Sequence, residues 1–295
     1  MIIIATHHVL SISEQQRLSD YLIGKFHEIP TRKGIKKAIL NHQVLVNDKL
    51  AVTAQLVNIN DKIELIEKQS APPQDFEVDL EIPFEDDFLA VVVKPAGIPV
   101  SGNLFKTLYN ALGENLKQSS QQDRLRWPLP IHRLDTATSG LVIIAKTHSV
   151  RVELGAMLEN KSIQKRYRAI LQGTIRENGI IDSPIDEKSA ISKFEVVENI
   201  TTLKDTSLTL VDFYPITGRT HQLRIHASSI GHPIVGDKLY KNETAMKTDK
   251  GLFLCAVEVQ FIHPVTKELL KVEINQPAKF DSYLQREKRR VTKYN

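Results

Sequence analysis

The chain has 295 residues, of which 41% are hydrophobic and 25% charged, which is typical of a globular protein and excludes a disordered or fibrous one. Its longest apolar runs, such as 89–93 and 141–145, are too short to span a bilayer, so we expect no membrane association. The apolar start after Met1 lacks the basic region of a signal peptide, and Cys255 has no second cysteine to pair with. We therefore expect a cytoplasmic protein.

The charge is mildly basic and unevenly distributed. Lysine and arginine number 39 against 35 aspartates and glutamates, a formal net charge of +4. The stretch 75–87 is strongly acidic, so the rest of the chain is more basic than the total indicates. This favours a polyanionic partner only modestly, and ordinary solubility explains the balance slightly better.

A proline-containing, acidic stretch, EKQSAPPQDFEVDLE at 67–81, has the composition of a linker. It divides the chain into a small N-terminal part and a larger body. We predict a small domain at 12–68, a linker at 69–81, a main domain at 82–280 and a basic tail at 281–295. The tail carries no signal of regular structure, and we expect it to be solvated.

The small domain is predicted to contain two helices followed by short strands. Ser11 or Ser13 is a candidate cap for the first helix, whose apolar residues recur at helical spacing: Leu18, Tyr21, Leu22 and Phe26. A second helix is predicted at 31–42. After it, QVLVNDKLA predicts a hairpin with an Asn47-Asp48 turn, and VNINDKIELI repeats this pattern.

The predicted second helix has one basic face. At 100° per residue, four cations fall on one side, opposite an apolar side with Ile35, Ala38 and Ile39; they are Arg32, Lys33, Lys36 and Lys37. Most such charge runs are solvated helix surfaces. The alternative interpretation is an RNA-binding surface.

The main domain is predicted to be rich in strands. Six strands are indicated, at 88–95, 141–146, 165–173, 207–216, 253–262 and 269–277, and two helices, at 149–161 and 220–231. The second helix should end at Gly231, as helices often end at glycine. Because helices and strands do not alternate regularly, we predict an α+β fold with a mixed, mostly antiparallel sheet flanked by helices and loops.

Several kinds of catalytic site find little support. His221 and His226 are five residues apart, about 140° around a helix, and so cannot both face one metal ion. Ser139 lacks the glycine pattern of a nucleophile elbow. Asp135 has no second acid close in sequence, although folding could bring one near it. The glycines of GHPIVGDK match no phosphate-binding loop and are expected to form a turn.

Asp135 and several basic residues form a more promising combination. An arginine, with Arg219 and Arg224 as candidates, could fix the Asp135 carboxylate by charge-assisted hydrogen bonds, as a carboxylate nucleophile requires. Tyr167, which stands among Lys165, Arg166 and Arg168, could stack on a base. Taken one at a time, these residues are better explained as a surface ion pair between Arg133 and Asp135 and as strand filler.

Taken together, they resemble a known family. HRLDTATSGLVIIAK resembles the signature of the RluA-type pseudouridine synthases, and three further motifs follow in the family's order: KRYRAILQG, TGRTHQLRIHASSIGHPIVGDKLY and FLCAVEVQFIHPVTKE. The resemblance covers about 82–278, with Cys255 where a histidine is common. Independently, 16–67 resembles the small S4-like RNA-binding module found in many members of this family.

The resemblance implies an enzyme that isomerises uridine to pseudouridine in RNA without a cofactor or metal. It implies that Asp135 is the catalytic aspartate, attacking either the uracil or the ribose, and that Arg224 pairs with it. Tyr167 would stack on the base, Arg133 would fill the gap left by the flipped nucleotide, and Leu254 would form a dry wall. The module's basic residues at 32–37 would bind the RNA backbone, and ribosomal RNA is favoured over transfer RNA.

Three rival functions remain. An RNA-binding protein that has lost activity would keep the scaffold, and a glycosylase or hydrolase could also use Asp135. An enzyme of small molecules is disfavoured by the basic N-terminal helix. We expect a monomer.

Overall fold

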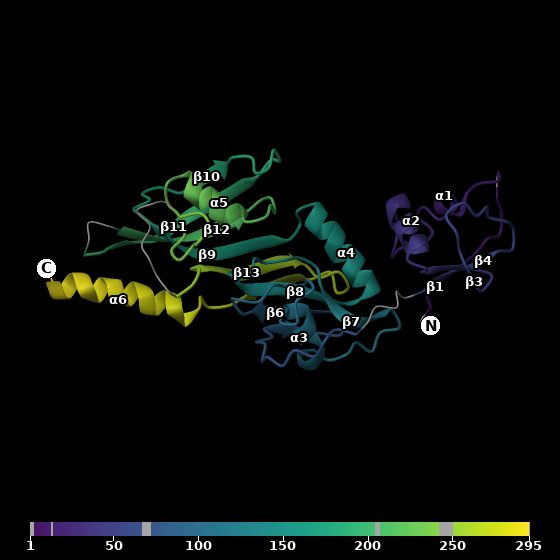
Figure 1. Cartoon of the computed structure of the whole chain (residues 1–295), viewed down its shortest axis with the longest axis horizontal. Helices are drawn as coiled ribbons and strands as arrows, with labels where there is room; N and C mark the ends of the chain where they lie inside the picture. The colour runs from purple at the N-terminus through teal and green to yellow at the C-terminus, as the bar shows by residue number, and fades with distance from the viewer. Residues whose placement is uncertain (1–2, 13, 67–71, 204–206, 242–249, 295) are drawn as a thin grey trace. The chain divides into compact units, whose positions relative to one another are not determined.

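The computed structural model describes residues 3–12, 14–66, 72–203, 207–241 and 250–294 (Figure 1). The chain forms two compact units that divide between Pro72 and Pro73. Each has its own hydrophobic core.

The N-terminal unit is a four-stranded antiparallel sheet with two helices. Its elements are β1 (Ile3–His8), α1 (Leu18–Tyr21), α2 (Arg32–Leu40), β2 (Val44–Val46), β3 (Lys49–Leu50) and β4 (Lys62–Ile66), and its strand order is β1-β4-β2-β3. The predicted start of this domain at residue 12 is wrong, because β1 pairs with β4 and so belongs to the sheet.

The second helix and the hairpin are confirmed. The Thr31 side chain caps α2 by accepting a hydrogen bond from the Gly34 N–H. Its apolar face is buried and its four cations are exposed. Asn47 and Asp48 turn the β2–β3 hairpin with φ of 50° and 65°, which asparagine and aspartate tolerate well.

Other details of this unit differ from expectation. Helix α1 has four residues and begins after Arg17, so Ser11 does not cap it, and Ser13 lies outside the described residues. The apolar residues after it are still buried, since Leu22 and Phe26 lie in the core. No strand forms at 57–59, where tertiary packing rather than a hairpin buries Val57.

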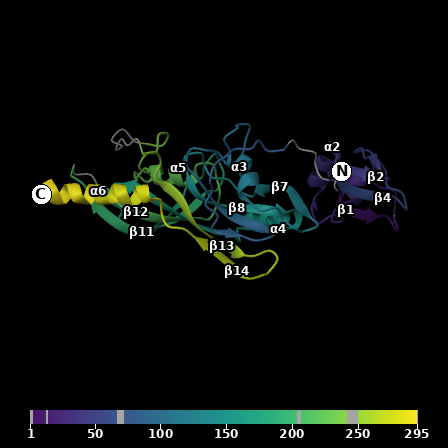
Figure 2. The same ribbon diagram turned by 90° about the horizontal axis from the view of Figure 1, so that it is seen from below.

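The larger unit is built on one ten-stranded mixed sheet (Figure 2). Its elements are β5 (Phe84–Glu85), β6 (Leu89–Lys94), α3 (Leu108–Asn115), β7 (Arg124–Pro130), β8 (Ser139–Thr147), α4 (His148–Glu159), β9 (Gln164–Gln172), β10 (Gly179–Asp182), β11 (Ile191–Thr201), β12 (Ser207–Pro215), α5 (Gln222–Ser229), β13 (Leu254–Ile262), β14 (Leu269–Glu273) and α6 (Ala278–Tyr294). The order is β10-β11-β12-β9-β13-β8-β6-β5, with β14 beside β13 and β7 beside β8.

The predicted α+β class is confirmed, and the sheet is mostly antiparallel. Strands β8 and β13 are its parallel pair, meeting where Ser139 and Gly140 face Cys255 and Ala256. Gly140 has φ of 113°, and a Cβ there would lie 2.2 Å from the Ala256 carbonyl oxygen. Only glycine allows this approach, which brings the start of β8 against β13.

Two predicted boundaries are wrong. The tail at 281–295 is not unstructured, because α6 extends to Tyr294 and buries Leu284 and Glu287. Residues 73–81 of the predicted linker belong to the larger unit, since Leu80 lies in its core and Phe76 and Val78 pack against it. This packing could not be predicted from periodicity, because residues 73–81 form no helix or strand with a regular apolar face.

Candidate active site

Asp135 lies in the loop between β7 and β8, and backbone contacts hold this loop in place. The Thr138 N–H donates to the Asp135 carbonyl at 3.0 Å, and the Gly97 N–H to the Thr136 carbonyl at 2.7 Å. Fully buried Lys94 donates through Nζ to the carbonyls of Pro95 and Ile98, both at 2.8 Å. These hydrogen bonds fix the backbone of the turn 135–138 and of the neighbouring segment 94–98. The Asp135 side chain is 17% exposed.

Arg224 reaches this carboxylate from the first turn of α5. Its Nη1 lies 3.4 Å from Asp135 Oδ2. A second aspartate, Asp237, holds the other edge of the guanidinium through Nε–Oδ2 at 2.7 Å and Nη2–Oδ1 at 2.8 Å. Arg224 is thus a buried bridge between two carboxylates, and its planar group is fixed by the bidentate pair with Asp237.

Asp237 is itself fixed by backbone donors. Its Oδ1 accepts from the N–H groups of Leu239 and Tyr240 at 2.9 and 3.1 Å. Burial acts to raise the pKa of Asp237, but the hydrogen bonds from Arg224 and these amides outweigh it and hold the pKa below its ordinary value. For Arg224, burial acts against the charge, yet the ion pairs raise its pKa. The buried pair is therefore charged, and it directs Arg224 toward Asp135.

His221 faces the other oxygen of the Asp135 carboxylate, with Nε2 3.8 Å from Oδ1. It is the residue before α5 and takes a left-handed conformation, φ 56°. Its Nδ1 lies 2.9 Å from the Tyr240 hydroxyl, and the Tyr240 ring lies 5.1 Å from the Arg224 guanidinium. Tyr240 thus contacts both His221 and Arg224, the two side chains that face the Asp135 carboxylate.

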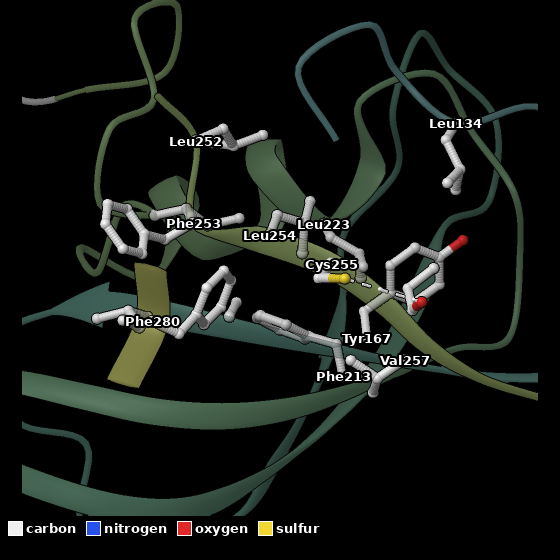
Figure 3. Packing of buried hydrophobic residues seen from close by; sticks show 14 of the residues in the cluster. Leu134, Tyr167, Phe213, Leu223, Leu252, Phe253, Leu254, Cys255, Val257 and Phe280 are labelled. Atoms are coloured by element: carbon white, nitrogen blue, oxygen red, sulfur yellow. Dashed lines mark hydrogen bonds between the residues drawn. The ribbon is translucent and has the colours of Figure 1, made fainter. Parts of the chain in front are cut away.

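Asp135 opens into a cavity of about 130 Å³. Tyr167 of β9 and Leu254 of β13 line it, together with Leu223, and the pairing of β9 with β13 places the two strands side by side. These side chains belong to the main core cluster shown in Figure 3, where Cys255 lies next to Leu254. Burial and nearby Asp135 raise the pKa of the Tyr167 hydroxyl, so the ring remains neutral.

The structure brings the predicted residues of the main domain together: Asp135, Arg224, Tyr167, Leu254 and Arg133 all line this cavity. The expectation for the cations around Tyr167 is only partly correct. Lys165 lines the cavity, but Arg166 and Arg168 lie on the other face of β9, where they bind Asp212. Alternation along a strand separates them from the tyrosine.

Histidine 132 supports the loop rather than the chemistry. Its Nε2 accepts from the Ile143 N–H at 3.1 Å. Burial, together with nearby Lys165, lowers its pKa from 6.5 to about 3, so the folded protein keeps it neutral.

We expect His132 to make the larger unit acid-sensitive. Since the unfolded chain binds a proton near pH 6.5 and the folded one near 3, stability is lost as pH falls through this window, by at most about 1.4 kcal/mol per pH unit. Denaturant unfolding of His132→Gln should show a smaller loss between pH 7 and 4 than the unmodified protein. Exposed His27→Gln is the control, and parallel curves for His132→Gln and the unmodified protein would refute the assignment.

Two kinds of feature are not found among the described residues. No group of three or more histidine, cysteine, aspartate or glutamate side chains there is placed to hold a metal ion. No helix in the described ranges has the length and apolar character needed to cross a membrane.

The fold and site define an enzyme centre in which a carboxylate, held by a buried arginine, faces a cavity with an aromatic wall. Comparison with known proteins specifies it further. Residues 88–229 match the family model of RNA pseudouridylate synthases. The chain is 32% identical to an uncharacterised RNA pseudouridine synthase of Bacillus subtilis over 81% of both chains. It is 31% identical to the ribosomal large subunit pseudouridine synthase C of Rickettsia bellii, over 92% of this chain and 96% of that one.

A solved structure shows the same fold. The human RNA pseudouridylate synthase domain containing 1 superposes with a TM-score of 0.55 at 24% identity, covering 68% of this chain and 84% of that one. The chain belongs to the RNA pseudouridine synthases of the RluA type. It is therefore an isomerase that acts on RNA.

Sequence reasoning missed three contributors to the site. Asp237 was assigned to a turn, His221 was rejected as a metal ligand and not assigned to the Asp135 carboxylate, and Tyr240 was given no role. The sequence offered one signal for Asp237, its position directly after Gly236 in VGDKLY. An aspartate there can accept hydrogen bonds from the backbone of a turn or from an arginine, and the sequence does not distinguish the two.

Proposed function

We propose that this enzyme isomerises uridines in large-subunit ribosomal RNA, with Asp135 as the catalytic group and transfer RNA as the second candidate substrate. The observation that carries the chemical part is the Asp135 carboxylate, oriented by Arg224 and opening into a small cavity. Relatives named as large-subunit synthases C and D support the choice of RNA. We propose that the protein acts as a monomer in the cytoplasm.

The reaction balances within the substrate itself. The N1–C1′ bond breaks, the uracil rotates, and a C5–C1′ bond forms, while C5 loses a proton and N1 gains one. Uridine and pseudouridine have the same atoms, so no electrons are exchanged with another molecule. Asp135 forms the transient covalent bond, either to the uracil ring or to the ribose, and is released at the end of the cycle.

The site also suits a base removed from its stack. Tyr167 and Leu254 offer an aromatic and an aliphatic surface to a planar ring. Because unstacking costs a few kcal/mol, a group that occupies the vacated space favours the open state. Arg133 is exposed at the mouth of the cavity, two residues from Asp135, and is the residue proposed for this role.

Two assays test the proposed function. RNA labelled with tritium at uracil C5 should release tritium without free uracil, whereas free uracil would support a glycosylase instead. Pseudouridine mapping of total RNA from cells with and without the gene should show the loss of specific large-subunit sites. Loss only of transfer RNA sites would overturn the choice of substrate.

The exposed cations of α2 are proposed to bind the RNA backbone. Each phosphate contact that a protein makes adds about 0.7 to 0.9 to the slope of log Kd against log salt concentration. The double variant Lys36→Ala, Lys37→Ala should therefore bind ribosomal RNA more weakly, with a slope lower by more than 1. Lys49→Ala, in the same unit but outside α2, is the control. An unchanged slope in the double variant would contradict the role.

A further inference from the structure

Next to the base cavity lies a second, larger depression of about 710 Å³, here called the outer groove. It is lined by the end of α4, the start of β9, and the segment that follows β12. Six residues line both spaces, which makes them continuous: Arg133, Lys165, Pro215, Thr217, Gly218 and Arg219. Anything attached to a base in the cavity must therefore pass this groove or the mouth beside it.

The groove is strongly basic. Arg133, Lys161, Lys165 and Arg219 line it, while Glu159 is the one acid among the described residues that do so. His132 also lines it but is neutral at physiological pH. The charge is thus concentrated on one side of Asp135, a distribution that attracts a polyanion.

Three of these cations have no acidic partner among the described residues. The side chains of Arg133, Lys161 and Lys165 make no hydrogen bond or ion pair with any residue that the structure describes. The Arg219 side chain donates to the carbonyl of Ser189, which carries no charge. By contrast, Arg166 and Arg168, on the opposite face of β9, are fully engaged with carboxylates.

Lys165 is the most informative of them, because its side chain is half-buried. Burial lowers its pKa, because partial removal from water disfavours the charged ammonium. A buried ammonium without an acid partner is stabilised when a ligand supplies the negative charge. Lys165 lies at the junction of cavity and groove, where the phosphate next to a bound uridine would be placed.

Lys161 gives a second, independent indication. It directly follows α4 and its cap residue Asn160, with φ of 63°, a conformation that favours glycine at helix ends. The backbone conformation therefore does not explain why a lysine stands at this position. Its side chain is exposed and lines the outer groove but not the base cavity.

We propose that the outer groove holds the sugar-phosphate backbone beside the target uridine, with Lys165 binding the phosphate nearest the base and Lys161 a phosphate further along the strand. This inference rests on the proposed function. The groove reads charge rather than sequence, so it fixes the register of the strand without selecting a nucleotide. The strand next to a flipped uridine presents its phosphates to the groove, so a single-stranded RNA is a sufficient probe.

The test uses the full chain, Lys161→Gly, Lys165→Met and the double variant. Lys161→Gly removes the cation while relieving the left-handed backbone, so weaker binding cannot be attributed to poor folding. Lys165→Met keeps the length of the side chain. Exposed Lys117→Met lines neither space and is the matched control. Binding of a fluorescein-labelled, U-rich 12-nucleotide RNA is measured at several salt concentrations.

We expect each single variant to bind about fivefold more weakly at low salt, with a slope lower by about 0.7, and the double variant to lose about twice this slope. Slopes equal to that of the unmodified protein would overturn the inference. Pseudouridine formation by the unmodified protein on transcribed large-subunit RNA is measured in parallel. If the unmodified protein forms pseudouridine but the variants keep its salt slope, only the role of the groove is contradicted. If the variants have lower slopes but no pseudouridine forms, only the proposed function is contradicted.

Discussion

Asp135→Asn should abolish pseudouridine formation, lowering turnover on the order of 10⁴-fold or more, while RNA affinity stays within about threefold. The amide has the shape of the carboxylate and can still accept a hydrogen bond from Arg224, but it is not a nucleophile. Loss of the Asp135 charge removes a repulsion with the RNA phosphates, so this change by itself does not weaken binding. Tritium release from C5-labelled RNA measures turnover, and fluorescence anisotropy measures affinity.

The matched control for this variant is Asp182→Asn, an exposed aspartate on β10 that lines neither the base cavity nor the outer groove. It should leave turnover and affinity unchanged. If Asp135→Asn retained turnover within tenfold of the unmodified enzyme, another group would have to form the covalent bond, and the nucleophile assignment would be abandoned.

Asp237→Asn should lower turnover by about 10²-fold although Asp237 touches no substrate. Its side chain is 1% exposed and supplies both oxygens to Arg224. An amide NH₂ in place of Oδ2 would face the Arg224 Nε–H, so that two hydrogen-bond donors meet. The buried guanidinium of Arg224 would also lose its main charged partner. We expect the free energy of unfolding to fall by about 3 kcal/mol. Displacement of Arg224 then misplaces the Asp135 carboxylate, which costs rate rather than affinity.

Asp212→Asn separates this positioning role from a loss of stability. Asp212 also forms a bidentate pair with an arginine, Arg168, but on the face of β9 away from the cavity. Both variants should be destabilised to a similar degree, and both are assayed well below their melting temperatures. Only Asp237→Asn should lose turnover with RNA affinity unchanged. Equal turnover in the two variants would show that Asp237 is merely structural.

Much of the architecture follows from local patterns. Continuous apolar runs such as LVIIAK give buried strands, and the alternation of cations with Ile35, Ala38 and Ile39 gives the amphipathic α2. The basic tail was misjudged because its helix is stabilised by packing: Leu284 and Glu287 are buried, and Lys288 pairs with Glu198 of β11. The buried apolar residues of α6 do recur at helical spacing, at Phe280, Tyr283 and Leu284, but they are few among many cations, and the prediction followed the charge.

The sequence by itself determined the family and the class of fold and proposed the site residues of its motifs, because these depend on residue types in a fixed order. Only the tertiary structure decided how they combine. It brought Asp237 behind Arg224, placed His221 against Asp135, and turned Arg166 and Arg168 away from the site while leaving Lys165 facing it. The physical reason is that the free energy of a buried charge depends on its neighbours in space, and folding alone fixes which residues become neighbours.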